Sequence, residues 1–374
     1  MPLPPTGGAN CLVPKGLVPK GLAPKSLAPK ASRQIFVLCL TSSLFLAAWR
    51  CPLGALPLIA RGTGEDVKSF AADFSLDTTQ ATADLDFMTS SPHPLGSSRQ
   101  WEVAKFLARR IEQSGARAEV QEFKADIPNA AALSMPAPLT RTVTGRNIYA
   151  WPTTAKPATS CVVLLASHYD TKIVEGISYV GANDSGSSSV GLLQLLRHVQ
   201  NAKDSTTLNG LKCRIGFVWF DGEESTLANW SDGETSFPQK IVDHTWGSRY
   251  AASQSRTQEI AALVLFDMIG SPELRLTRDS NSSAPLMGLL EESIRALGYP
   301  ADLLSAVAVP VEDDHIPFLD LGIPAINIID FNDLSVWHRP GDDAGRINPK
   351  SIEKALRIGV LVALAAARDP QAIR

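Results

Sequence analysis

The sequence predicts an α/β fold, a three-layer sandwich in which helices cover both faces of a twisted, mostly parallel central sheet. Four short runs are almost continuously apolar, as strands buried on both faces of a sheet are. They are residues 161–166, 215–220, 263–266 and 325–329. Helical patterns lie between these runs, and strands that alternate with helices along a chain usually pair in parallel.

The expected helices justify the outer layers in chain order. A polar helical stretch spans residues 70–88, and an amphipathic helix spans 100–114. Three more helical patterns cover 187–200, 245–254 and 284–297, and an apolar-faced helix at 352–367 closes the chain. We place all of these elements in one catalytic domain, residues 67–374, which is long and apolar enough to bury a large core.

Two segments of a different character precede this domain. Residues 1–34 repeat pentapeptides such as LVPKG, and a proline at every fifth position prevents a helix, so we expect a disordered, lysine-rich segment. Residues 35–60 are two apolar stretches. We predict that they form either a signal peptide, cleaved after Ala60, or an uncleaved N-terminal membrane anchor. Both alternatives export the domain, which would be periplasmic, secreted or membrane-anchored.

Charge and cysteine content exclude some classes of function. The formal charge of −3 is spread without basic blocks, so we expect no nucleic-acid partner. Of the five cysteines, only Cys161 and Cys213 lie in the predicted domain, and no C-x-x-C pair offers a thiolate metal site. A bridge between them is compatible with an oxidising compartment, but we favour two unbridged, buried side chains on neighbouring strands.

Acidic and histidine side chains follow the predicted strands where each one ends. In open α/β sheets, functional groups gather beyond the carboxyl ends of the strands. The residues at these positions are His168 and Asp170, Glu223 and Glu224, Asp267, and Trp337 with His338; Asp184 precedes a helix in GANDSGSSS. Individually, His168 fits a core histidine and Asp184 fits a helix cap. Together, the ordered set favours one site at one edge of the sheet.

Zinc binds nitrogen and carboxylate ligands of this kind, and a catalytic zinc keeps one coordination position open. Asp184, Glu224 and His338 would supply three protein ligands. Adjacent side chains diverge at a strand end, so Glu223 would remain free for proton transfer.

The motifs resemble those of glutaminyl-peptide cyclotransferases (glutaminyl cyclases), a branch of the zinc aminopeptidase-like family. The motifs that carry the resemblance are SHYDTK (167–172), VGANDSG (180–186), FDGEES (220–225), WGSRYAA (246–252), LVLFDMIGSP (263–272), EDDHIPFLDLGIP (312–324) and VWHRPGDD (336–343). The resemblance implies the zinc aminopeptidase-like fold and one catalytic zinc on Asp184, Glu224 and His338. It also implies that Glu223 is the general acid/base.

Further roles follow from the same resemblance. Asp267 and Asp313 would form a hydrogen-bonded acid pair beside the general acid/base. Trp230, Trp337 and Phe331 would bind the substrate. The implied reaction is an acyl transfer that cyclises N-terminal Gln, and possibly also Glu, of peptides or proteins to pyroglutamate; with Gln, ammonia is released.

The sequence also departs from the family pattern. The segment ESTLANW is one residue longer than the family pattern, and DFNDLSVWH, which contains Phe331, is similarly offset. Ser167 and Ser189 stand where animal members carry a disulfide, and Glu312 stands where many members have Gln.

Two alternatives to a cyclase remain open. In a zinc aminopeptidase, His168 and Asp267 would hold a second zinc with Asp184 bridging, and the metal would activate water. Asp170 and His315 would either join a second metal or support the first site. A non-catalytic binding domain is disfavoured because no expected ligand is missing.

Overall fold

The computed structural model describes residues 64–153, 161–202 and 205–374, which all belong to one compact unit. The α-helices are α1 (Glu65–Ala72), α2 (Thr78–Met88), α3 (Ser98–Gln113), α4 (Ser188–Asn201), α5 (Thr206–Asn209), α6 (Asp232–Thr235), α7 (Trp246–Ala252), α8 (Ala284–Ala296), α9 (Ile316–Leu319) and α10 (Pro349–Arg368). Within the described ranges, no helix combines the length and the apolar character needed to cross a membrane. The repeat and the signal peptide or anchor predicted for residues 1–60 lie outside these ranges.

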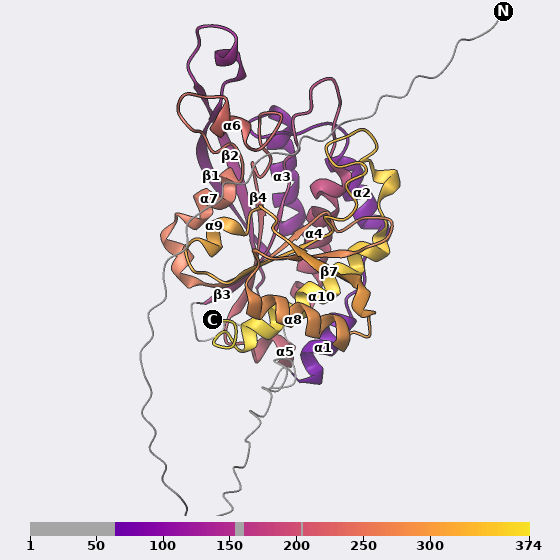
Figure 1. Ribbon diagram of the computed structural model, residues 1–374. Coiled ribbons are helices and arrows are strands. Elements are labelled where there is room, and N and C mark those ends of the chain that lie inside the picture. The colour runs from indigo at the N-terminus through magenta and orange to yellow at the C-terminus, as the bar shows by residue number, and fades with distance from the viewer. Residues whose placement is uncertain (1–63, 154–160, 203–204) are drawn as a thin grey trace, which may run out of the picture. The chain divides into compact units, whose positions relative to one another are not determined.

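The strands form a six-stranded sheet and a separate two-stranded one (Figure 1). They are β1 (Arg117–Pro128), β2 (Thr140–Trp151), β3 (Val162–His168), β4 (Arg214–Phe220), β5 (Ile260–Asp267), β6 (Leu276–Asp279), β7 (Leu304–Val309) and β8 (Ala325–Ile329). The large sheet has the order β1-β2-β4-β3-β5-β8, and β4, β3, β5 and β8 are mutually parallel. The predicted mostly parallel sheet is therefore confirmed.

Both faces of the parallel strands are buried, which explains their continuous apolar sequences. On β3, Val163 and Leu165 pack in the core beneath α1, α2, α3, α4, α8 and α10. Val162, Leu164 and Ala166 point to the opposite face, where α7 and α9 cover the sheet (Figure 1). The three-layer arrangement is thus confirmed, with one thick helical layer and one thin one.

The single helix predicted over residues 70–88 is wrong, because two helices occupy this stretch. Helix α1 ends at Ala72, and Asp77 begins α2 as its N-cap by accepting a hydrogen bond from the backbone N–H of Gln80. An Asp at such a position competes for backbone donors and so favours a new helix start over continuation.

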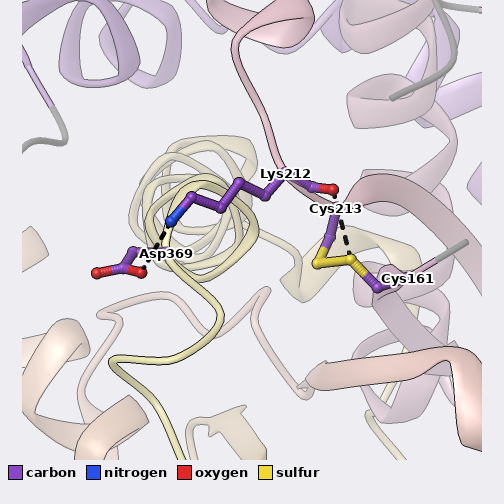
Figure 2. Close-up of a disulfide and its surroundings, with 4 residues drawn as sticks. All are labelled: Cys161, Lys212, Cys213 and Asp369. Atoms are coloured by element: carbon purple, nitrogen blue, oxygen red, sulfur yellow. Dashed lines mark hydrogen bonds and ion pairs between the residues drawn. A yellow bond between two sulfur atoms is a disulfide. The ribbon is translucent and has the colours of Figure 1, made fainter. Parts of the chain in front are cut away.

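The preferred interpretation of the two domain cysteines is also wrong, since Cys161 and Cys213 form a disulfide (Figure 2). Each residue directly precedes a strand, β3 or β4. These strands are paired in parallel with Val162 opposite Arg214, so the two Cα atoms lie 4.8 Å apart. This separation lies within the range that a disulfide spans.

Candidate active site

The parallel strands deliver the predicted site residues to one edge of the sheet. His168 is the last residue of β3 and Asp267 is the last residue of β5. Glu223 and Glu224 follow β4 after a short turn at Gly222, whose φ of 72° lies in the left-handed region that favours glycine.

Asp184, Glu224 and His338 converge on one point. One ligand atom from each of these residues lies within 4.8 Å of the others. The Nε2 atom of His338 is 3.0 Å from Glu224 Oε1 and 3.3 Å from Asp184 Oδ2. The main chain of His338 is in the left-handed region (φ 52°), a strained conformation of the kind that concentrates at functional sites.

His168, Asp184 and Asp267 make a second group that could hold a metal ion. The Nε2 atom of His168 lies 3.2 Å from Asp184 Oδ1 and 3.4 Å from Asp267 Oδ1. Asp184 is therefore shared, with one carboxylate oxygen facing each group.

Asp170 lies beside these groups without belonging to either one. Its carboxylate accepts hydrogen bonds from the backbone N–H groups of Glu223 (3.0 Å) and Glu224 (3.3 Å). It therefore positions the main chain of the two glutamates. His315 lies apart, fully buried with its Nε2 3.0 Å from Asp279 Oδ2.

The chemistry of these residues fits a bound cation. The buried atoms Glu224 Oε2, Asp267 Oδ1 and both ring nitrogens of His168 have no hydrogen-bond partner among the described residues. Burial lowers the pKa of His338, but the carboxylates of Glu224 and Asp184 outweigh burial and raise the pKa to about 10. Carboxylates packed this closely require compensating positive charge, which a divalent ion can supply in place of protons.

Glu223 has the electrostatic setting of a proton-transfer group. Burial raises the pKa of its carboxyl well above the usual range; the charge of His168 opposes this shift and that of Asp313 adds to it. A carboxyl with a raised pKa can both accept and return a proton near neutral pH.

Asp267 and Asp313 line the same cavity as Glu223. Asp313 accepts hydrogen bonds from the side chain of Asn327 (2.7 Å) and from the backbone N–H of Asp314. Burial, followed by the charge of Asp267, raises the pKa of Asp313 well above its usual value.

A cavity of about 210 Å³ opens onto these groups. Its lining contains the nine residues predicted for catalysis, metal binding and substrate binding: Asp184, Glu223, Glu224, Trp230, Asp267, Asp313, Phe331, Trp337 and His338. The sequence did not single out the other five for the pocket: Met268, Pro310, Val311, Glu312 and Ile329. The ring of Trp337 stacks on His338 (4.2 Å between centroids) and meets the ring of Phe331 edge-on (5.4 Å). Trp230 stacks on His244 (4.0 Å). Three aromatic side chains therefore line the cavity beside the donor groups.

Two further features complete the description. Ser167 and Ser189 contact each other through their hydroxyl oxygens (3.3 Å). A larger cavity, of about 860 Å³, lies beside the amino end of β5 and the chain terminus. Its lining includes no His, Asp or Glu, so we locate the chemistry in the smaller cavity.

Sequence reasoning missed Tyr179 and Asp342, which contact the Asp184 loop. The hydroxyl of Tyr179 is 3.1 Å from Asp184 Oδ2, and Asp342 accepts hydrogen bonds from the same loop. The sequence contained a signal for both residues, because Tyr179 directly precedes the motif VGANDSG and Asp342 lies within the motif VWHRPGDD.

Known proteins share both the sequence pattern and the fold. A model of peptidase family M28 matches residues 147–363. A glutaminyl-peptide cyclotransferase of Drosophila melanogaster is 26% identical over 293 residues, which cover 73% of this chain and 77% of that protein. The structure resembles that of a glutaminyl cyclase from an Acidobacteriales bacterium, with 25% identity, a TM-score of 0.61, and coverage of 80% of this chain and 94% of that one. A Zn-dependent exopeptidase from Parabacteroides distasonis shares the fold at 19% identity, with a TM-score of 0.59 and coverage of 78% and 98%. The similarity to glutaminyl cyclases and the zinc aminopeptidase-like fold are thus confirmed.

Proposed function

Since the chain belongs to peptidase family M28, we propose that it is a glutaminyl-peptide cyclotransferase, which converts N-terminal Gln of peptides or proteins to pyroglutamate and releases ammonia. The observation that carries this proposal is the small aromatic cavity above the Asp184, Glu224 and His338 group. At about 210 Å³ it is smaller than the roughly 300–1,000 Å³ typical of drug-sized ligands, and so suits a single side chain. The similarity to glutaminyl cyclases supports the same assignment.

Asp184, Glu224 and His338 would hold one zinc ion. When bound, zinc supplies Lewis-acid polarisation of the γ-carbonyl of the substrate. The Zn-dependent exopeptidase of the same fold agrees with this choice of metal, as do the mixed nitrogen and carboxylate donors.

Glu223 would move the proton. The α-amine of the substrate attacks the γ-amide carbon, and Glu223 takes one proton from that amine. The new carbon–nitrogen bond closes the lactam ring, and the bond to the amide nitrogen breaks. Glu223 returns the proton to that nitrogen, which leaves as ammonia. Burial raises the pKa of Glu223, and the neighbouring carboxyl of Asp313 adds to that shift, as both steps require.

The aromatic walls would fold the substrate and exclude water. Nucleophile and electrophile belong to the same residue, so holding the side chain in a folded conformation supplies much of the rate enhancement. Trp230, Trp337 and Phe331 line the cavity, where they would pack against the substrate methylenes.

A paired assay tests this function on the purified protein. A peptide with N-terminal Gln should yield one ammonia per peptide, with no loss of chain length, from protein that contains one zinc. Release of the free N-terminal amino acid by protein with two zincs would support the aminopeptidase alternative, for which His168, Asp184 and Asp267 offer the second site. Glu223→Gln should abolish turnover and retain zinc, whereas the control Glu234→Gln, at an exposed position on α6, should leave turnover unchanged.

We also propose that the domain is exported. The disulfide between Cys161 and Cys213 supports this proposal, because disulfides persist mainly in oxidising compartments. Fractionation of cells that produce the full chain tests it; recovery of the protein in the cytosol with free thiols would contradict it.

A further inference from the structure

Tyr179 and Asp342 have no part in the proposed chemistry, yet they hold the loop that carries Asp184. We propose that these two residues form a brace that positions Asp184 for metal binding, and we call them the Tyr179–Asp342 brace. The inference rests on the proposed function, in which Asp184 is a zinc ligand, and adds two positioning residues to it.

Asp342 binds the main chain of the Asp184 loop at three successive residues. Its Oδ1 accepts from the N–H of Asn183 (2.7 Å), and its Oδ2 accepts from the N–H of Asp184 (3.2 Å). Its own backbone carbonyl accepts from the N–H of Ala182 (3.3 Å). The loop therefore cannot shift without losing several buried hydrogen bonds, each of which is costly to leave unmade.

Tyr179 holds the side chain of the same ligand. Its hydroxyl lies between Asp184 Oδ2 (3.1 Å) and Asp342 Oδ2 (3.0 Å), and the residue is only 2% exposed. The edge of its ring also meets the ring of His338, with 5.7 Å between centroids and an interplanar angle of 85°. Tyr179 thus contacts two of the three residues that would hold the zinc.

The position of Asp342 explains why such a brace matters. It lies four residues after His338, so it links the segment that carries one ligand to the loop that carries another. Asp184 faces His168 with Oδ1 and His338 with Oδ2. A rotation of this carboxylate would therefore change which of the two possible metal-binding groups each of its oxygens faces. The brace fixes Oδ2 towards His338 and Glu224.

The loop departs from regular helical geometry at the ligand itself. Residues 182–187 form a π-helical segment interrupted by a kink, where Asp184 and Ser185 have non-helical backbone angles. Gly181, with φ of 57°, begins the turn, and a Cβ atom there would lie 2.1 Å from the carbonyl oxygen of Asp184. The contacts from Tyr179 and Asp342 therefore act at the residue where helical geometry is interrupted.

Zinc affinity separates positioning from a purely structural role. The experiment measures the zinc dissociation constant of the full-length protein by competition with a chromophoric chelator, alongside circular dichroism and cyclase kinetics. The variants are Asp342→Ala and Tyr179→Phe. The matched control is Asp343→Asn, whose exposed side chain caps the N–H of Gly345 and contacts no ligand loop.

We expect Asp342→Ala to weaken zinc binding by about 10–100-fold and Tyr179→Phe by about tenfold, as is typical when groups that orient metal ligands are removed. Excess zinc should restore kcat in Tyr179→Phe, and Asp343→Asn should bind zinc within about twofold of the wild type. Tyr179→Phe decides the matter alone if Asp342→Ala does not fold.

Two results would overturn the brace, and they differ from one another. If folded variants bind zinc as tightly as the wild type, the residues only stabilise the loop, and the proposed function stands. If the wild type itself binds no zinc, the proposed function fails as well.

Discussion

The disulfide between Cys161 and Cys213 should stabilise the domain without affecting the active site. The perturbation is the double variant Cys161→Ser, Cys213→Ala, in which alanine avoids an unpaired hydroxyl at the fully buried position 213. The two cysteines are 52 residues apart. For a closed loop of this length, the chain-entropy relation gives a loss of about 4 kcal/mol in the free energy of unfolding.

That loss converts to a shift in melting temperature. A domain of about 300 residues has an unfolding entropy of about 0.6 kcal/mol per kelvin, so Tm should fall by roughly 6 °C. The bridge joins the amino ends of β3 and β4, whereas the site lies at their carboxyl ends. Seven residues of β3 span about 20 Å between them. We therefore expect kcat/KM at 25 °C to stay within about twofold of the wild type.

Differential scanning calorimetry and cyclase kinetics measure both quantities. Wild-type protein reduced with a phosphine is the matched control, since it keeps both side chains and lacks only the bond. A fall in Tm of less than about 1 °C in both samples would refute the loop-closure argument. A large loss of activity in folded, unbridged protein would refute the separation of the bridge from the site.

Three other outcomes are expected. Burial lowers the pKa of His93 to about 4, below its unfolded value near 6.5, so its contribution to stability is complete above pH 6.5 and is lost as the pH falls towards 4. Urea titrations measure the loss of unfolding free energy between pH 7 and pH 4.5, and this loss should be smaller in His93→Gln than in the wild type by up to about 3 kcal/mol. An equal loss in both proteins would contradict this role of His93. Gly359→Ala would place a Cβ 2.2 Å from the ring of Phe266 and should lower the free energy of unfolding by about 1–3 kcal/mol. Gly288→Ala, with no atom within 4 Å of its Cβ, should instead stabilise α8 by up to about 1 kcal/mol. Equal Tm values for the two variants would contradict the close packing at Gly359. Trp337→Ala should lower kcat/KM by on the order of tenfold or more. An unaltered kcat/KM would show that Trp337 does not contribute to substrate binding.

The sequence predicted the parallel strands but not the antiparallel edge of the sheet, for a physical reason. Strands β3, β4, β5 and β8 are buried on both faces, so their sequences are continuously apolar. Strand β1, RAEVQEFKADIP, is largely exposed along its first half and alternates polar with apolar residues. The signal of such a strand is this alternation, which is weaker than the continuous apolar run of a strand buried on both faces.

The residues of the site were predictable for the same reason that the strands were. Asp267 and His168 end strands that the apolar pattern reveals, and strand ends meet at one edge. The contacts of Asp342 were not predictable, since they join backbone N–H groups to a side chain 158 residues away. The bridge of Cys161 to Cys213 depended on a strand register that composition does not specify.

The donor atoms alone do not decide between cyclisation and hydrolysis, because Asp184 belongs to both groups of residues that could hold a metal ion. The shape of the cavity bears on the choice. A peptidase must admit water and the residues on both sides of the scissile bond, whereas a cyclase needs to enclose only one folded side chain. Trp337, whose ring contacts those of His338 and Phe331, lines the cavity beside one of the proposed zinc ligands. Exclusion of water there would slow hydrolysis and leave an intramolecular attack unaffected. The aromatic wall, more than the ligand set, therefore favours the cyclase.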